Sequence, residues 1–92
     1  MISVIISTHN RPSLLRRAIL SVLNQSGVFE IIVVDDSSSR YKHENVKILK
    51  NFPAISYFSI AANGACYSRN FGASKAKNKY LAFLDDDDYW LN

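Results

Sequence analysis

Short apolar runs that end in polar or acidic residues recur along this sequence, and they restrict the folds that it can adopt. The run YLAFL at residues 80–84 is followed by four aspartates at residues 85–88, and the run FEIIVV at residues 29–34 is followed by two more. Apolar runs of this length without regular alternation are typical of strands that are buried on both faces of a parallel sheet. Six of the eight acidic residues therefore follow directly on two predicted strands.

Segments with helical periodicity separate the predicted strands. An apolar stripe at helical spacing predicts a helix that begins at Pro12 and ends before Gly27. Another helix is predicted over residues 65–77, with small residues along one of its faces. A weaker amphipathic pattern at residues 41–50 predicts a short helix, and the pair Asn63-Gly64 indicates a turn. The predicted strands are at residues 2–6, 29–34, 55–60 and 79–84.

The alternation of strands and helices implies right-handed crossovers and parallel pairing. We therefore predict an α/β fold with a parallel, Rossmann-like sheet of about four strands and flanking helices, forming one truncated domain over residues 1–92. The carboxyl ends of parallel strands lie along one edge of the sheet, and open α/β sheets bind their ligands there. This edge is expected to collect the polar residues 8–10, the acidic residues 35–36 and the acidic residues 85–88.

Composition narrows the class of protein. Eleven Lys and Arg against eight Asp and Glu give a net charge of +3. The basic residues are scattered along the chain, so we expect no nucleic-acid partner. The single cysteine, Cys66, excludes an internal disulfide, fits a reducing compartment and is expected to be a buried structural thiol. The first strand begins at Ile2, which leaves no room for a signal peptide, and no apolar run approaches the ~20 residues that span a bilayer. We expect a cytoplasmic segment whose membrane association, if any, is encoded elsewhere.

The four aspartates at residues 85–88 are the strongest chemical feature. Like charges about 5 Å apart repel by roughly 3 kcal/mol at an effective dielectric constant near 20, so the cluster needs water or a cation. Carboxylate oxygens at this density suit Mg²⁺ or Mn²⁺, with phosphate oxygens and water completing the coordination. A solvated acidic turn is the alternative interpretation.

The residues resemble the family 2 glycosyltransferases of the GT-A fold along the whole chain. The resemblance rests on VIISTHNRPSLLRRAILSVLNQ, FEIIVVDDSS and NGACYSRNFGASKAKNKYLAFLDDDD, in this order and spacing. It implies a nucleotide-diphosphate sugar donor, commonly a UDP-sugar, with Mn²⁺ or Mg²⁺ as cofactor and inversion at the anomeric carbon. The acceptor could be a saccharide, a lipid or a protein.

The resemblance also implies roles for residues of the first two strand ends and of the last helix. Thr8 and Asn10 match the family's residues that line the base and ribose pocket. Asp36 or Asp35 matches the acid that holds the uracil edge, as expected for a carboxylate that accepts from an imide N–H. Arg69 matches the donor-pocket arginine, although it could instead be a surface salt-bridge partner.

The family's Asp-x-Asp motif matches residues 85–87. By that match, Asp85 or Asp86 faces the ribose, Asp87 binds the metal with Asp85 as a further ligand, and Asp88 supports the metal through water. A cation across the diphosphate neutralises the charge that develops on the leaving group. His9 is expected to line the pocket.

The sequence departs from the family pattern at three loop positions, with Ser7 in place of a common proline and with Ser37 and Ala65 in place of glycines. The general base that activates the acceptor hydroxyl is expected beyond Asn92, so no catalytic residue is assigned. An alternative function is a non-catalytic nucleotide-sugar-binding module, or an inactive fragment.

Other classes of nucleotide-binding protein do not fit the sequence. Residues 7–12 contain no glycine, which excludes the phosphate-binding turns of dehydrogenases and P-loop proteins. No aspartate follows residues 55–60, as a phospho-acceptor receiver would require.

Overall fold

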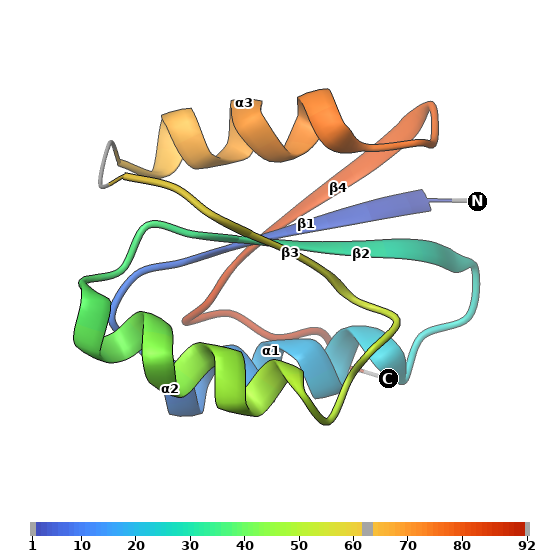
Figure 1. The fold of residues 1–92 in the computed structure, drawn as a ribbon. Helices are drawn as coiled ribbons and strands as arrows, with labels where there is room; N and C mark the ends of the chain where they lie inside the picture. The colour runs from blue at the N-terminus through green and yellow to red at the C-terminus, as the bar shows by residue number, and fades with distance from the viewer. Residues whose placement is uncertain (1, 62–63, 92) are drawn as a thin grey trace.

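The computed structural model describes residues 2–61 and 64–91, in which strands and helices alternate. The elements are β1 (Ile2–Thr8), α1 (Pro12–Leu23), β2 (Val28–Asp35), α2 (Ser39–Leu49), β3 (Ser56–Ser59), α3 (Ala65–Lys75) and β4 (Tyr80–Asp85). All strand pairs are parallel, and the strand order is β3-β2-β1-β4 (Figure 1). The predicted α/β fold with a four-stranded parallel sheet is therefore confirmed. Asn63, at the predicted turn, lies outside the described residues.

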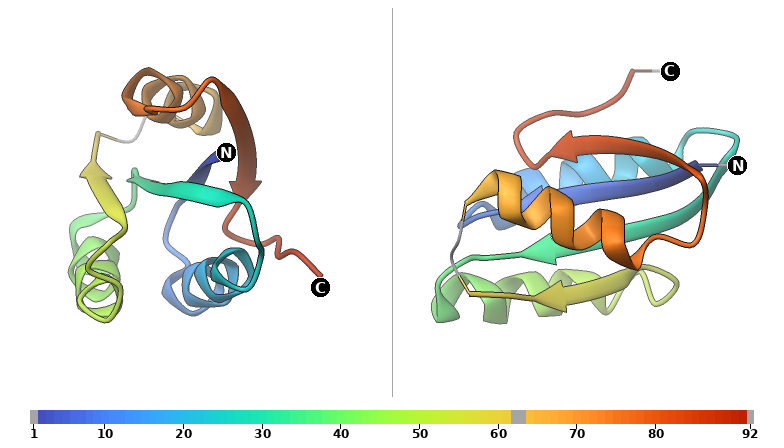
Figure 2. Two further views of the ribbon diagram at one scale, coloured as in Figure 1. Left: turned by 90° about the vertical axis from the view of Figure 1, so that its right-hand side faces the viewer. Right: turned by 90° about the horizontal axis from the view of Figure 1, so that it is seen from above.

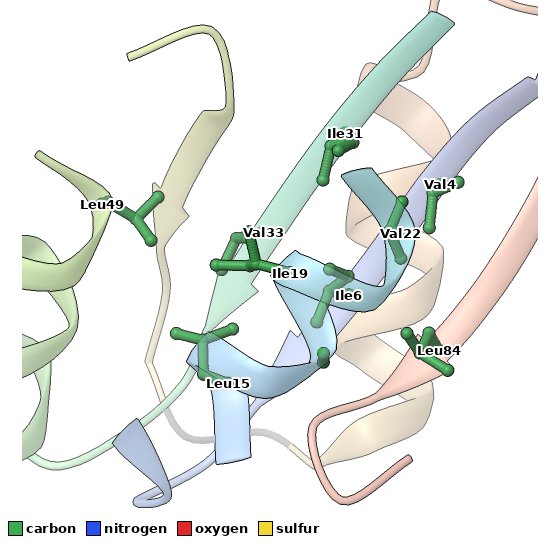
Figure 3. Packing of buried hydrophobic residues seen from close by; sticks show 10 residues of the cluster. Val4, Ile6, Leu15, Ile19, Val22, Ile31, Val33, Leu49 and Leu84 are labelled. Carbon is green, nitrogen blue, oxygen red and sulfur yellow. The ribbon is translucent and has the colours of Figure 1, made fainter. Parts of the chain in front are cut away.

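Helices cover both faces of the sheet. Helices α1 and α2 lie on one face and α3 lies on the other, as the two further views make clear (Figure 2). The apolar stripe of α1 is buried against the even-numbered side chains of β1 and the odd-numbered side chains of β2 (Figure 3). Each fully buried Leu, Ile or Val contributes about 1.5–3 kcal/mol, so this layer holds most of the core. The stripe residues are Leu15, Ala18, Ile19 and Val22.

The opposite face of the sheet depends on a close approach by α3. Gly72 is buried, and a Cβ at this position would lie 2.5 Å from Cγ2 of Ile5. The predicted small-residue face is confirmed at Gly72, but Ala65 is exposed. Cys66 is also exposed, so the expected buried thiol is wrong: its position on α3 faces away from the sheet.

Strand β4 is an edge strand, and the prediction that residues 80–84 are buried on both faces is wrong. Leu84 is buried, whereas Tyr80, Leu81 and Phe83 are 65%, 38% and 46% exposed. The reason is the strand order: β4 pairs with β1 on one side only, and α3 packs over β1 and β2 rather than over β4. An apolar run therefore does not by itself distinguish a central strand from an edge strand.

The parallel register brings the strand ends together. Thr8 lies beside Asp35, and Ser7 lies beside Asp85, so residues distant in the sequence meet at one edge of the sheet. After β4 the chain turns back along α1, where Trp90 packs on the core and its backbone N–H donates to Ser21. Among the residues described, no helix has the length and apolar character needed to span a bilayer.

Candidate functional site

A cavity of about 390 Å³ opens at the carboxyl ends of β1 and β4 and beside the first turn of α3. Its volume falls within the usual range for small-molecule sites. The predicted site residues that line it are Thr8, Asp36, Asp85, Asp86 and Asp87. His9 lines it too, as expected, whereas Asn10, Asp35 and Arg69 lie outside its lining.

Asp35 and Asp36 are adjacent, but their side chains continue opposite faces of β2. Asp35 continues the face of Ile31 and Val33, which packs under α1 and α2. Asp36 continues the face of Ile32 and Val34, on the side of α3, and reaches the cavity. The alternation of side chains along a strand thus separates the two carboxylates.

The carboxylate of Asp35 is fully buried and is held by three donors. The backbone N–H of Ser37 donates to Oδ1 at 2.9 Å, while the Asn45 amide and the Tyr57 hydroxyl donate to Oδ2 at 2.9 and 2.6 Å. Burial, and then the neighbouring Asp35 carboxylate, raise the pKa of Tyr57 well above its usual value. Asp35 therefore secures α2 and β3 to the end of β2 and does not face the cavity.

Asp86 joins the end of β4 to the loop after β1. Its Oδ2 accepts hydrogen bonds from the Thr8 hydroxyl at 2.9 Å and from the His9 backbone N–H at 3.0 Å, and the residue is only 5% exposed. The Arg11 guanidinium lies 3.4 Å from Oδ1. Each of these contacts bridges more than 70 positions of sequence, so Asp86 fixes the floor of the cavity.

Asp85, Asp87 and Asp88 form a cluster that fits a divalent cation. Each can place one carboxylate oxygen within 4.8 Å of the others, and Asp87 and Asp88 are exposed. Oxygen atoms at this separation need small side-chain rotations to reach the coordination distances of Mg²⁺ or Mn²⁺. The cluster includes Asp85 and Asp87, the two ligands predicted from the sequence.

Two arginines balance these acids. Nη2 of Arg69 lies 2.9 and 3.0 Å from the two carboxylate oxygens of Asp85, and Nη1 of Arg11 lies 3.2 Å from Asp87. Arg69 thus reaches the site through Asp85. Arg11 was not among the predicted site residues, although its place directly after the polar residues 8–10 was a usable signal.

Asn10 connects the loop after β1 to the loop after β2. Its backbone has a positive φ of 56°, which asparagine tolerates better than most residues. Its N–H donates to the Ser37 hydroxyl, and its Oδ1 accepts from the Ser38 backbone N–H. Asn10 shapes the rim of the cavity through these contacts.

The first turn of α3 also contributes to the cavity, although none of the lining residues in this turn was predicted from the sequence. Gly64, Ala65 and Ser68 line it, and Gly64 has a φ of 89° that places the start of the helix at the site. The positive end of a helix dipole favours anionic groups. Together with Arg11, which lies beside Asp86 and Asp87, it adds positive charge to the lining of the cavity.

Comparison with known proteins identifies the family. The model of the family "Glycosyl transferase family 2" matches residues 3–92. A glycosyltransferase of Rickettsia bellii is 40% identical over 99% of this chain and 13% of its own length. The Escherichia coli enzyme WfaP, a UDP-Glc:alpha-D-GlcNAc-diphosphoundecaprenol beta-1,3-glucosyltransferase, is 34% identical over 99% of this chain and 37% of its own length.

A solved structure supports the same assignment. Staphylococcus aureus TarS, residues 1–349, in complex with UDP-GlcNAc, superimposes with a TM-score of 0.79 at 27% identity, covering 96% of this chain and 27% of that chain. The chain thus spans well under half the length of each of these proteins. The four-stranded sheet matches the nucleotide-binding half of the GT-A fold of TarS. The chain belongs to glycosyl transferase family 2.

Proposed function

We propose that this chain is the donor-binding half of a metal-dependent glycosyltransferase that holds a nucleotide-diphosphate sugar for transfer to an acceptor hydroxyl. The observation that carries the proposal is the meeting of Thr8, Asp36 and residues 85–87 in one cavity beside the first turn of α3. The complex of TarS with UDP-GlcNAc, at 27% identity over nearly the whole chain, supports a UDP-sugar as the donor.

The arrangement of charges suggests how the donor would lie. Asp36, at the end of β2, would accept from the base, and Asp85 or Asp86 would accept from the ribose hydroxyls, since carboxylates accept well from both kinds of donor. The diphosphate would lie toward Asp87, near Arg11 and the first turn of α3. Thr8 and Asn10 would support the base and ribose side, the latter through the loop contacts that it makes.

The acidic cluster would hold the cation. Asp87 and Asp85 are the proposed ligands, with Asp88 within reach of the same position or of a bound water. Either Mg²⁺ or Mn²⁺ accepts such oxygen ligands. When bound, the cation stabilises the charge that develops on the leaving nucleotide diphosphate. Arg69, which contacts both oxygens of Asp85, would orient this carboxylate and offset its charge.

The remaining parts of the reaction follow from the resemblance to the family. Transfer with inversion requires a general base near the acceptor hydroxyl. We assign the carboxylates that line the cavity to donor binding, and none of them to the role of general base.

We also propose a cytoplasmic location, because a single cysteine among 92 residues fits a reducing compartment. A binding module without turnover is the second candidate.

Calorimetric titration of UDP, with and without Mn²⁺, tests the donor site on this chain. We expect metal-dependent binding that Asp87→Ala weakens by at least about tenfold, because a charge-assisted contact is lost. Glu44→Ala is the matched control, since it removes an exposed carboxylate on α2 that does not line the cavity. Absence of UDP binding by the folded chain, or equal binding by Asp87→Ala, would contradict the proposal.

A further inference from the structure

His9 and Asp36 form a side-chain pair at the mouth of the cavity. Nδ1 of His9 lies 2.9 Å from Oδ1 of Asp36, and the two residues come from the ends of β1 and β2. The side chain of Asp36 is 7% exposed, whereas that of His9 is 59% exposed. His9 therefore buries little surface, and its clearest effect in the structure is on the Asp36 carboxylate.

The neighbouring residues define which ring nitrogen carries the proton. Oδ1 of Asn10 accepts from the Ser38 backbone N–H at 2.9 Å, which fixes the orientation of the Asn10 amide. Its Nδ2 then lies 3.4 Å from Nε2 of His9 and donates to it. A neutral ring that accepts at Nε2 carries its proton on Nδ1, so His9 donates to Asp36. The hydrogen bonds run in one direction, from Ser38 through Asn10 and His9 to Asp36.

This chain of hydrogen bonds sets the orientation of the carboxylate. The terminal torsion of an aspartate side chain is soft, so burial alone leaves a carboxylate free to rotate. Because Oδ1 of Asp36 is engaged by His9, its Oδ2 would be the oxygen left to accept from a ligand in the cavity. A fixed carboxylate oxygen accepts the imide N–H of uracil, but it repels the lone pair on the ring nitrogen of cytosine at the same place.

We propose that His9 is a positioning residue that holds the Asp36 carboxylate in the orientation that selects a uracil base over cytosine. This inference rests on the proposed function, since it assumes that the cavity holds a nucleoside diphosphate. A site built to hydrogen-bond a substrate group rejects the analogue that lacks it, because the buried polar group is left without a partner. His9 thereby acts on base selectivity and not on the diphosphate.

The test is the ratio of the UDP and CDP affinities, measured by calorimetry in the presence of Mn²⁺. We expect the wild-type chain to prefer UDP and His9→Leu to lower that preference by about tenfold, as for the loss of one hydrogen bond to a charged group. His9→Asn should retain most of it, because its amide nitrogen occupies nearly the position of Nδ1. Asp36→Asn should abolish the preference, and His43→Leu, an exposed histidine of α2, should leave it unchanged.

The imidazole nitrogen signals in NMR give an independent readout. The wild-type chain should show His9 protonated on Nδ1, and this signal should change in Asn10→Ala, which removes the donor to Nε2. A ring that only stacks on the base would weaken UDP and CDP binding equally in His9→Leu and leave their ratio unchanged, which would overturn the inference alone. Wild-type protein that binds neither nucleotide would overturn the proposed function as well.

Discussion

The hydroxyl of Tyr57 on β3 donates a 2.6 Å hydrogen bond to the carboxylate of Asp35 at the end of β2. Burial of the ring and the nearby negative charge both favour the neutral phenol, so the pKa of Tyr57 is raised well above its usual value. The folded state therefore holds this proton more tightly than the unfolded chain does. The titration of Tyr57 therefore reports on the contact between β3 and the end of β2.

Tyr57 should ionise at a pH well above the range that is usual for tyrosine, because its pKa is raised. Its stabilising contribution is fully present below the unfolded pKa of about 10 and is lost as the pH rises through the higher folded value. In a titration followed by tyrosinate absorbance, Tyr57→Phe should remove the most alkaline component. Tyr67→Phe, at a half-exposed position on α3, is the control and should leave this component in place. A titration in which Tyr57→Phe removes an early component would contradict this prediction.

The adjacent acids Asp35 and Asp36 should differ in what their loss affects. Asp35→Asn should lower the free energy of unfolding by about 1–3 kcal/mol, because an amide group then faces donors in a fully buried site. Asp36→Asn should have a smaller effect on stability and a larger effect on UDP affinity, since Asp36 lines the cavity. Urea denaturation measures the stability of both variants, and calorimetric titration measures their affinity for UDP. A larger loss of stability in Asp36→Asn, together with a larger loss of UDP affinity in Asp35→Asn, would contradict this prediction.

Gly72→Ala should destabilise the fold. The added Cβ would lie 2.5 Å from Cγ2 of Ile5 and 3.2 Å from Cγ2 of Val34, in a packed layer with little room to shift. Overpacking of this kind costs about 1–3 kcal/mol, which outweighs the gain of about 1 kcal/mol from helix propensity. Thermal unfolding should show a lower Tm than for Cys66→Ala, an exposed position on the same helix. Adding Ile5→Ala should reduce the further loss caused by Gly72→Ala.

The free edge of β4 predicts self-association of this 92-residue chain. Leu81 and Phe83 are exposed on the same side of the strand. An antiparallel pair of β4 strands with Ala82 opposite Ala82 would place Leu81 of each copy against Phe83 of the other. Such cross-strand apolar pairs are favourable, and an unprotected edge invites them.

Sedimentation at micromolar concentration checks this pairing. Phe83→Lys should shift the chain toward the monomer, because it places a charge opposite Leu81 of the second copy. Leu91→Lys is the control, since it replaces a side chain that is 79% exposed and lies outside β4. A monomeric wild-type chain, or equal effects of the two substitutions, would count against the edge as the site of association.

Local sequence patterns were sufficient for the order and type of the elements. The β-branched run at residues 2–6 lies inside β1, and the stripe that begins at Pro12 forms α1. Even the weak pattern at residues 41–50 corresponds to α2, which spans Ser39–Leu49. These predictions succeed because the period of apolar residues is a local property that reflects which face of each element is covered.

The pairing of distant residues was beyond local patterns. The exposure of Leu81 and Phe83 depends on the strand order, because β4 has one neighbouring strand and α3 packs over β1 and β2 rather than over β4. The His9–Asp36 pair joins residues 27 positions apart, and the role of Asp86 depends on contacts across more than 70 positions. None of these relationships leaves a periodic signal in the chain.

The sequence by itself determined an α/β chain of the glycosyltransferase family, with acidic residues at two strand ends and a shared edge where they meet. The tertiary structure decided which carboxylate serves which purpose: Asp35 holds α2 and β3, Asp36 faces the cavity, and Asp86 ties β4 to β1. The physical reason is that side-chain period is set within each strand, whereas burial and hydrogen-bond partners are set by the strands and helices packed around it.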